Sequence, residues 1–171
     1  MNTLPKQLDP FRYAQQEQKL DAMVALDVLP RIKDLLVSCK SNVAVHFSFY
    51  RDASGFNVLD LKIEGALLLL CQRSLEPFDY AYTSSSTLCF LKDGADDQAV
   101  PESYEIWPMD APFIDPYVLV EEELLLGIPP APVNPFSKEI DLGVKNGYNG
   151  APSGTHQPFA VLKDLKNLKE K

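Results

Sequence analysis

Cysteine and histidine are the residues of this chain that could most readily do chemistry, and the most promising cysteine is residue 71. Cys71 opens the string CQRSLEPF, in which Ser74 stands at the third following position. A zinc site commonly begins with two ligands about two to four residues apart, but serine is a poor zinc ligand. No cysteine or histidine follows in the acidic segment 93–141 to complete a set. The sequence therefore predicts no metal and no other cofactor, with Cys71 as a half-buried residue at a strand end.

Nucleophilic catalysis needs a nucleophile beside a positioned base. His46 lies in a strand-like stretch and His156 among turn residues, and neither has the sequence neighbours that known catalytic motifs supply. The chain also has no glycine-rich loop of the kinds that cradle phosphates. Its three cysteines (Cys39, Cys71 and Cys89) are odd in number and widely spaced, which suits reduced thiols better than disulfides. We therefore predict a protein that is not an enzyme and has no small-molecule substrate.

The net charge of −8 is distributed unevenly along the chain. Residues 1–92 are neutral, residues 93–141 carry twelve acidic residues and one basic residue (−11), and residues 142–171 carry +3. An acidic middle disfavours broad contact with a phosphate backbone and would attract a basic protein. It could equally be a solvated surface that keeps the protein in solution. The composition leaves both interpretations open.

The positions of these residues depend on the strands expected around them. Apolar residues alternate with polar ones in 42–50 and again in 59–64, which predicts two strands joined by a turn at 51–55. The alternation stops after Gly65, where Leu67 to Leu70 are apolar on both faces. Either the strand enters the interior there or Gly65 marks a bulge. Residues 80–91 predict a third strand and residues 104–107 a short fourth one.

Two main helices are expected to pack on this sheet. The first covers residues 29–36, with Asp27 as the cap and Pro30 in the first turn. The second covers 115–127, where Asp115 caps, Pro116 takes the first helical position and Gly127 closes the end. Residues 4–20 are predicted to be an extended lead-in or an edge strand. The fold class is thus α+β, with an antiparallel β-sheet core.

Three consecutive glutamates, Glu121 to Glu123, advance by about 100° each in the second helix, so they cannot share one face. At least one must lie close to the apolar stripe of that helix. We expect that side chain to reach out to water, and the alternative is a carboxylate presented to a basic partner.

The prolines and glycines divide the chain into three parts. Residues 1–130 are predicted to form a single domain, and residues 131–158, rich in proline and glycine, a flexible connector. Residues 159–171 predict a short basic amphipathic helix with Phe159, Leu162, Leu165 and Leu168 on one side. The first residues lack the apolar stretch of a signal peptide, and the longest apolar run is too short to cross a bilayer. A cytoplasmic protein without membrane contact is expected.

Three strings in this order, CQRSLEPF, VEEELLLGIPPAP and PFAVLKDLK, together with LDPFRYA near the start, resemble the YceD family of bacterial large ribosomal RNA subunit accumulation proteins. The resemblance spans nearly the whole chain. The residues that match the three motifs are Cys71, Gln72, Arg73, Leu75, Glu76 and Pro77, then Glu121, Glu123, Leu124, Leu125, Pro129 and Pro132, then Pro158, Phe159, Ala160, Val161 and Leu162. With them, Glu122, Lys163 and Lys166 complete the candidate binding residues.

The resemblance implies a non-enzymatic factor needed for normal levels of 23S rRNA, with a large-subunit ribosomal protein, the 23S rRNA precursor, or both as partners. It brings no catalytic residues. Many members have a second cysteine where Ser74 stands, and a histidine and a cysteine after the second motif. Here Asn134 lies near the histidine position and no cysteine follows. Any role shared with the family must then work without metal.

Two questions stay open at this stage. Arg73 is expected to form a salt bridge with Glu76 or with the acidic helix, and the alternative is direct contact with RNA. The protein as a whole could also be an acidic regulatory or holdase-like module for a basic partner, without direct rRNA contact and with Glu121 to Glu123 as its binding face.

Overall fold

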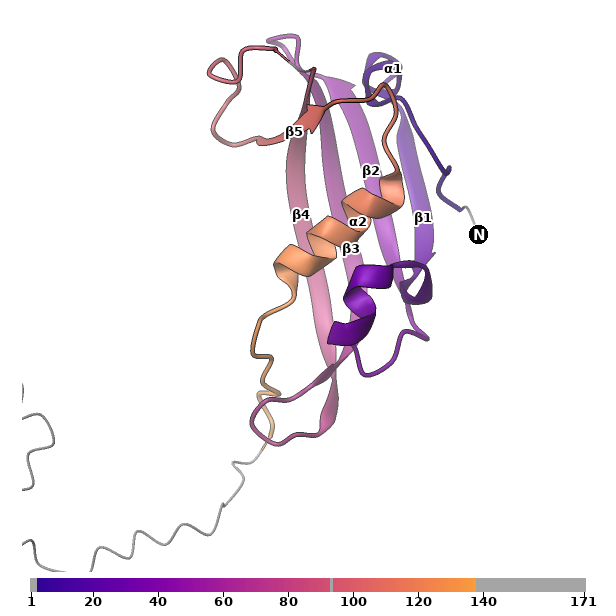
Figure 1. The fold of residues 1–171 in the computed structure, drawn as a ribbon, viewed down its shortest axis with the longest axis vertical. Coiled ribbons are helices and arrows are strands. Elements are labelled where there is room, and N and C mark those ends of the chain that lie inside the picture. The colour runs from indigo at the N-terminus through magenta and orange to yellow at the C-terminus, as the bar shows by residue number, and fades with distance from the viewer. Residues whose placement is uncertain (1–2, 93, 138–171) are drawn as a thin grey trace, which may run out of the picture. The chain divides into compact units, whose positions relative to one another are not determined.

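A computed structural model describes residues 3–92 and 94–137 of the 171-residue chain. Five strands form one sheet, and their order in space follows their order in the chain (Figure 1). They are β1 (Lys19–Ala25), β2 (Asn42–Arg51), β3 (Asn57–Leu70), β4 (Pro77–Lys92) and β5 (Glu105–Met109). The first four strands pair antiparallel, whereas β5 runs parallel to β4.

The α+β class is therefore confirmed, but the expectation of a purely antiparallel sheet is wrong. The strand predicted at 104–107 is present as β5, and the link of residues 93–104 before it is far longer than a hairpin turn. A link of about a dozen residues is long enough to bring the chain back and start a parallel strand. The strand was predictable from its residues, but its direction was not.

Alternating apolar side chains put the core on one face of the sheet. Val43, Val45, Phe47 and Phe49 of β2 are at most 1 % exposed. They pack with apolar residues of β3 and β4, and Phe49 stacks with Phe90 at 6.3 Å between ring centroids. The period-2 pattern thus indicated correctly which side of each strand is buried.

Gly65 lies within a continuous strand. Pairing runs without a break from β2 through β3 to β4, with Gly65 opposite Val43. A Cβ atom at residue 65 would lie 2.8 Å from Val43 Cγ1, so the close approach of β2 requires glycine there. The bulge alternative is therefore wrong. The alternation instead continues through the leucine run, where Leu67 and Leu69 are fully buried and Leu70 is 39 % exposed.

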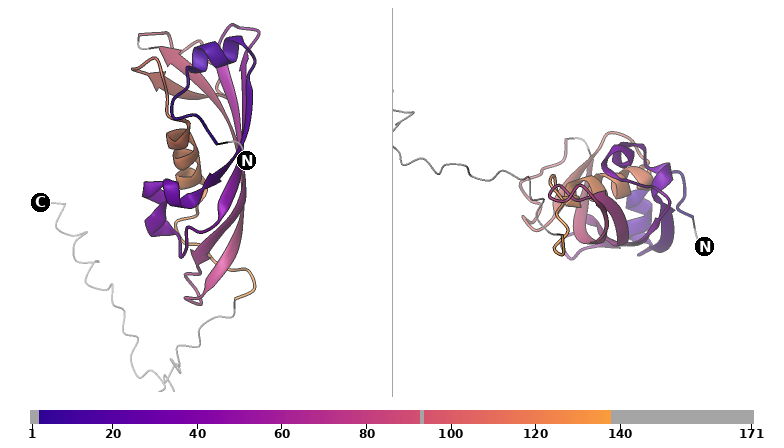
Figure 2. Two further views of the ribbon diagram at one scale, coloured as in Figure 1. Left: turned by 90° about the vertical axis from the view of Figure 1, so that its right-hand side faces the viewer. Right: turned by 90° about the horizontal axis from the view of Figure 1, so that it is seen from below.

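The helical elements lie on the core face of the sheet (Figure 2). They are α1 (Pro10–Gln15), the 3₁₀ turns η1 (Leu26–Val28) and η2 (Pro30–Leu35), and α2 (Pro116–Gly127). Helix α1 lies at one end, and the 3₁₀ turns lie beside α2. Helix α2 begins as predicted. The Asp115 side chain accepts a hydrogen bond from Tyr117 N at 2.9 Å, and Pro116 takes the first position. Gly127 is its last residue, where a Cβ atom would lie 2.4 Å from Tyr82 Oη.

The first predicted helix differs from the observed structure. Asp27 lies inside η1 and caps nothing, and η2 begins after Leu29 without a side-chain cap. Only Ile32 of η2 is fully buried, and the chain then becomes extended, since Val37 N donates to Leu68 O at 2.8 Å. This bond draws the segment after η2 onto the end of β3, so the sheet rather than local periodicity decides where the helical segment ends.

The predicted extended lead-in at 4–20 is also partly wrong. Asp9 Oδ1 accepts hydrogen bonds from Phe11 N and Arg12 N, and Pro10 opens the six-residue helix α1. Both signals are present in the sequence, but the helix is too short for periodicity to show it. The edge strand follows as β1.

The predicted C-terminal helix and most of the predicted connector lie outside the described residues, and with them the candidate residues Pro158, Phe159, Lys163 and Lys166. The proposed domain boundaries remain a prediction. In the described part of the chain, no helix is long and apolar enough to cross a membrane.

Candidate functional site

The first motif forms a tight turn between β3 and β4 at one end of the sheet. Cys71 N donates to Glu76 O at 2.9 Å, and Leu75 N donates to Cys71 O at 2.8 Å. Leu75 has a φ of +58°, a left-handed conformation that is uncommon for a side chain of this kind. We call this turn, residues 71–76, the corner.

The end of the second motif folds back onto the corner. We call residues 128–137 the proline segment, because Pro129, Pro130, Pro132 and Pro135 lie in it. Gln72 N donates to Pro132 O at 2.8 Å, which joins the two motifs through their backbones. Candidate residues 71–77, 129 and 132 are thus brought together, although more than fifty residues separate the two groups in the chain.

Arg73 fastens the same two segments. Its Nε donates to Ser137 Oγ at 2.9 Å, and its Nη2 donates to Asn134 O at 3.0 Å and to Ser137 O at 2.6 Å. Within residues 3–92 and 94–137 it forms no ion pair with Glu76 or with α2. The predicted salt bridge is therefore wrong, because backbone carbonyl groups and a hydroxyl group meet the planar guanidinium instead.

The Cys71 sulfur lies at the centre of the corner and is fully buried. It accepts hydrogen bonds from Ser74 N and Asn134 N, both at 3.4 Å, and lies 3.5 Å from Ser137 Oγ. Burial by itself raises the pKa of this thiol, but its hydrogen bonds with Ser137, Ser74 and Asn134 outweigh that effect and lower the pKa to about 6. Cys71 is more deeply buried than the sequence suggested, and it acts as an acceptor that holds the proline segment.

The residues of the corner do not suit zinc. Ser74 and Asn134 do come together around Cys71, but they offer a neutral hydroxyl and a neutral amide where zinc prefers thiolate and imidazole. In the part of the chain that is described, no three His, Cys, Asp or Glu side chains are grouped so that they could hold a metal ion. Hydrogen bonds connect the two motifs at this position.

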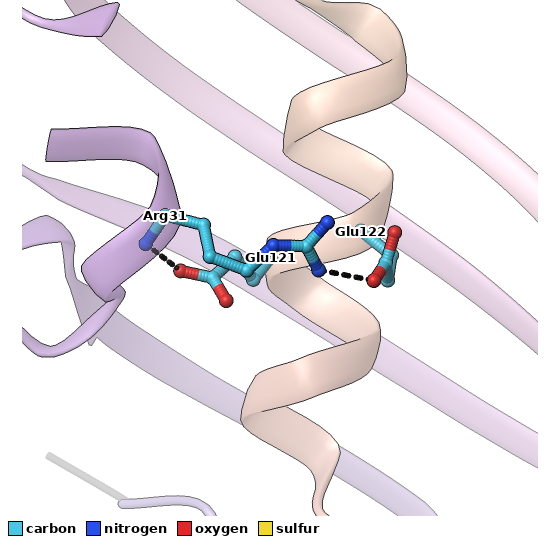
Figure 3. A network of polar contacts seen from close by, with 3 residues as sticks. All are labelled: Arg31, Glu121 and Glu122. Carbon is cyan, nitrogen blue, oxygen red and sulfur yellow. Dashed lines mark hydrogen bonds and ion pairs between the residues drawn. The ribbon is translucent and has the colours of Figure 1, made fainter. Parts of the chain in front are cut away.

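The three glutamates of α2 all bond to other groups of the protein, and Glu121 is the buried one. Glu121 is 5 % exposed and accepts a hydrogen bond from Arg31 N at 2.6 Å, while Glu122 forms an ion pair with the Arg31 guanidinium (Figure 3). Glu123 accepts a bond from Ser86 Oγ at 2.8 Å. The expectation that the carboxylate nearest the core reaches water is wrong, because a backbone N–H of η2 satisfies it in the interior.

These glutamates connect α2 to η2 on one side and to β4 on the other. Tyr82 Oη also donates a hydrogen bond to Glu123 O at 2.7 Å. On the other side, the hydrogen bond to Glu122 raises the pKa of Arg31 above its ordinary value. None of the three binds Arg73. The second motif therefore has two separate structural roles, one in positioning α2 and one at the corner.

Sequence reasoning missed several residues that the structure shows to be important. Asn134 and Ser137 hold Arg73, but nothing in a proline-rich stretch distinguishes them. His46 Nδ1 lies 2.7 Å from Asp21 Oδ1 on the outer face of the sheet. That pair could have been found if residues 19–25 had been recognised as a strand beside β2, because register then places residue 21 opposite residue 46.

Apolar side chains are exposed around the corner. Leu75, Val133 and Phe136 are 61 %, 46 % and 91 % exposed. Beside them, Leu35, Leu70 and Leu125 line a hollow of about 430 Å³ together with Asp34, Gln72 and prolines of the proline segment. Large exposed apolar side chains next to a rigid turn are typical of a surface that contacts another macromolecule.

Comparison with known proteins gives one family. The model of the family described as "Large ribosomal RNA subunit accumulation protein YceD" matches residues 59–166. A protein of that name from Haemophilus influenzae is 31 % identical over 170 residues, which covers 95 % of this chain and 96 % of the relative. No solved structure matches the chain. The match begins in β3 and includes both motifs that meet at the corner, and the chain therefore belongs to the YceD family of large ribosomal RNA subunit accumulation proteins.

Proposed function

We propose that this protein is a non-enzymatic ribosome biogenesis factor that supports the accumulation and maturation of 23S rRNA and of the large ribosomal subunit. The observation that carries the proposal is membership of the YceD family along nearly the whole chain. The site itself adds support. At the corner, a buried thiol accepts hydrogen bonds and the Arg73 guanidinium binds the proline segment, so both side chains serve to join two segments of the chain.

A basic large-subunit protein is the partner that the charges favour most. In the described part of residues 93–141, acidic side chains such as Asp96, Asp97, Glu102 and Glu105 are exposed and have no basic neighbour in the sequence. Such a surface repels phosphate groups and attracts lysine and arginine. Contact with the 23S rRNA precursor would then fall to other parts of the chain, with Lys163 and Lys166 as the proposed residues.

The direct test is to deplete the protein from cells of its own species and measure 23S relative to 16S rRNA. We expect the ratio to fall and to recover when the wild-type chain is supplied again. An unchanged ratio would refute the proposed function. The cytoplasm is the proposed location, since large subunits are assembled there.

A second experiment separates protein contact from RNA contact. Tagged protein is recovered from growing cells with and without nuclease treatment, and the bound ribosomal proteins are identified. Retention of a basic large-subunit protein after nuclease supports direct protein contact. Loss of every ribosomal partner would instead assign the contact to RNA, and a double Lys163→Glu, Lys166→Glu variant should then lose it as well.

The alternative function, an acidic binding module without a ribosomal role, was based on Glu121 to Glu123 as its binding face. Their internal bonds to Arg31 and Ser86 leave that face less available than the sequence suggested. Sedimentation discriminates between the two functions, because a ribosome factor should sediment in part with large-subunit precursors and a separate regulator should stay at the top of the gradient.

A further inference from the structure

Within the part of the chain that the structure describes, the sheet has one long edge without a partner strand. Strand β5 pairs only with Leu88 to Lys92 of β4, so no strand from residues 3–92 or 94–137 lies beside residues 77–87 on that side (Figure 1). Among the described residues, no backbone hydrogen bond from another segment reaches this edge. An edge of this kind presents a row of N–H and C=O groups that can pair with a further strand.

The register shows which backbone groups are free. Cys71 N donates to Glu76 O, so residue 76 faces β3, and in an antiparallel pair this orientation alternates along the strand. The N–H and C=O groups of Asp79, Ala81, Thr83 and Ser85 therefore point away from β3. Pro77 fits this assignment, because its nitrogen, which has no hydrogen to donate, also points outward.

Natural proteins protect exposed edges with lysines, prolines or short strands. The other two edges follow this rule. β5 has five residues and contains Pro108, and β1 has seven residues and begins with Lys19. The stretch 78–87 of β4 has no proline, lysine or arginine. It is the edge on which the sheet has the least protection against pairing.

The surroundings of this edge are acidic. Asp79 lies near one end of it, and two glutamates lie at the other end, Glu105 opposite Leu88 and Glu123 bound to Ser86. Leu126, which is 76 % exposed, adds an apolar side chain next to Gly127, the residue that packs on Tyr82. An extended strand placed here would meet carboxylates near both of its ends and an apolar side chain near its centre.

We propose that residues 79–85 of β4 form a docking edge that binds an extended, basic segment of a partner protein by strand addition. The inference rests on the proposed function, and it specifies how a basic large-subunit protein would be held: main-chain hydrogen bonds give affinity, and the acidic surroundings select lysine and arginine. A second copy of this chain is the less suitable occupant, since each copy carries a net charge of −8 and pairing would bring two acidic edges together.

Residue-resolved amide hydrogen exchange on the full chain tests the proposal. The probe is a nine-residue peptide of alternating lysine and valine, blocked at both ends. In the free protein the amides of Ala81, Thr83 and Ser85 should exchange fast, and those of Tyr82 and Ser84, bound to β3, slowly. The probe should slow the first set by at least about tenfold, as expected when each amide gains a hydrogen bond.

Two control peptides separate strand addition from charge attraction. A version with every backbone nitrogen methylated keeps its charge but cannot donate hydrogen bonds, and a version with glutamate in place of lysine keeps the backbone but reverses the charge. Both should bind at least about tenfold more weakly. Equal binding of the methylated peptide would overturn the proposal, as would an absence of protection at residues 81–85 when the lysine peptide binds.

A matched pair of variants tests the edge in the protein itself. Thr83→Pro blocks the docking edge without removing a hydrogen bond to β3. Met23→Pro is the matched change at the free edge of β1. Phe49 N donates to Gln18 O, so residue 18 faces β2, and the alternation along β1 then turns the N–H of residue 23 away from β2. Only Thr83→Pro should weaken binding of the lysine–valine peptide. If it does not fold, Thr83→Lys repels the basic peptide and replaces it in the comparison.

The same pair separates this inference from the proposed function. In depleted cells, Met23→Pro should restore the 23S to 16S ratio and Thr83→Pro should not. Full restoration by folded Thr83→Pro would overturn the docking edge while leaving the proposed function intact, whereas failure of the wild-type chain to restore the ratio would refute the function itself. Slow exchange at residues 81–85 in the free chain, lost at high dilution, would show a second copy as the occupant and overturn the basic partner.

Discussion

Replacing Arg73 with alanine tests whether this arginine holds the corner or contacts RNA. In the structure its guanidinium donates three hydrogen bonds, at 2.9, 3.0 and 2.6 Å, to Ser137 Oγ and to the carbonyl oxygens of Asn134 and Ser137. A hydrogen bond contributes a net of about 1 kcal/mol, and somewhat more when the donor is charged. Because Arg73 is only partly buried, water replaces part of each bond.

We therefore expect Arg73→Ala to lower the free energy of unfolding by about 2 kcal/mol. In a folded unit of this size that corresponds to a decrease in melting temperature of about 6 °C. The stability of Arg73→Lys should lie between those of the wild type and Arg73→Ala, because lysine keeps the charge but cannot form the planar fork of hydrogen bonds. Arg51→Ala is the matched control, since Arg51 donates one hydrogen bond, to Gly55 O, at an exposed turn.

Thermal denaturation followed by circular dichroism measures the global effect, and amide exchange at Gln72 and Asn134 measures the local one. Both amides bond across the corner, so they should exchange faster in Arg73→Ala even if the proline segment detaches without global unfolding. Melting and exchange that match the wild type would refute the structural role. If such a variant also failed to restore 23S rRNA, Arg73 would be assigned to RNA contact.

Three further predictions concern the interior. Glu121→Leu should lower the free energy of unfolding by about 1–3 kcal/mol in chemical denaturation, because it leaves Arg31 N buried without an acceptor. Glu121→Gln keeps an oxygen that can accept this bond and should therefore cost less stability. Equal losses in the two variants would contradict the hydrogen-bond account. Gly127→Ala should lower the free energy of unfolding by about 1–3 kcal/mol and break the hydrogen bond from Tyr82 to Glu123 O, because the added Cβ would lie 2.4 Å from Tyr82 Oη. A variant as stable as the wild type would show that α2 can shift away from Tyr82. The pKa of Cys71, about 6 when folded against an ordinary value of 9.0, means that the unfolded chain binds the extra proton between these values. The stability advantage of the wild type over Cys71→Ser should accordingly be greatest above about pH 9 and be lost as the pH falls through about 6. A difference in melting temperature that does not depend on pH would contradict this prediction.

The strands and the main helix could be predicted because their signals are local. Alternating apolar residues mark the buried face of β2 and β3, and Asp115 with Pro116 marks the start of α2. These features report the environment of each residue within a few neighbours along the chain. For the same reason a helical spacing at 29–36 was misleading, since residues with a period near three also suit a 3₁₀ turn, and the bond from Val37 to Leu68 decides where it ends.

By itself, then, the sequence determined the α+β class, the buried faces of the main strands, the acidic middle of the chain and the family. Only the tertiary structure decided the direction of β5, the burial of Glu121 against Arg31 N, and the joining of Cys71 and Arg73 to residues 134–137. The reason is that a buried polar group must find its partner somewhere in the fold, and no local pattern states which distant segment provides it. The corner is built from two segments about sixty residues apart in the chain, so its chemistry exists only once the sheet has formed and the proline segment has returned to it.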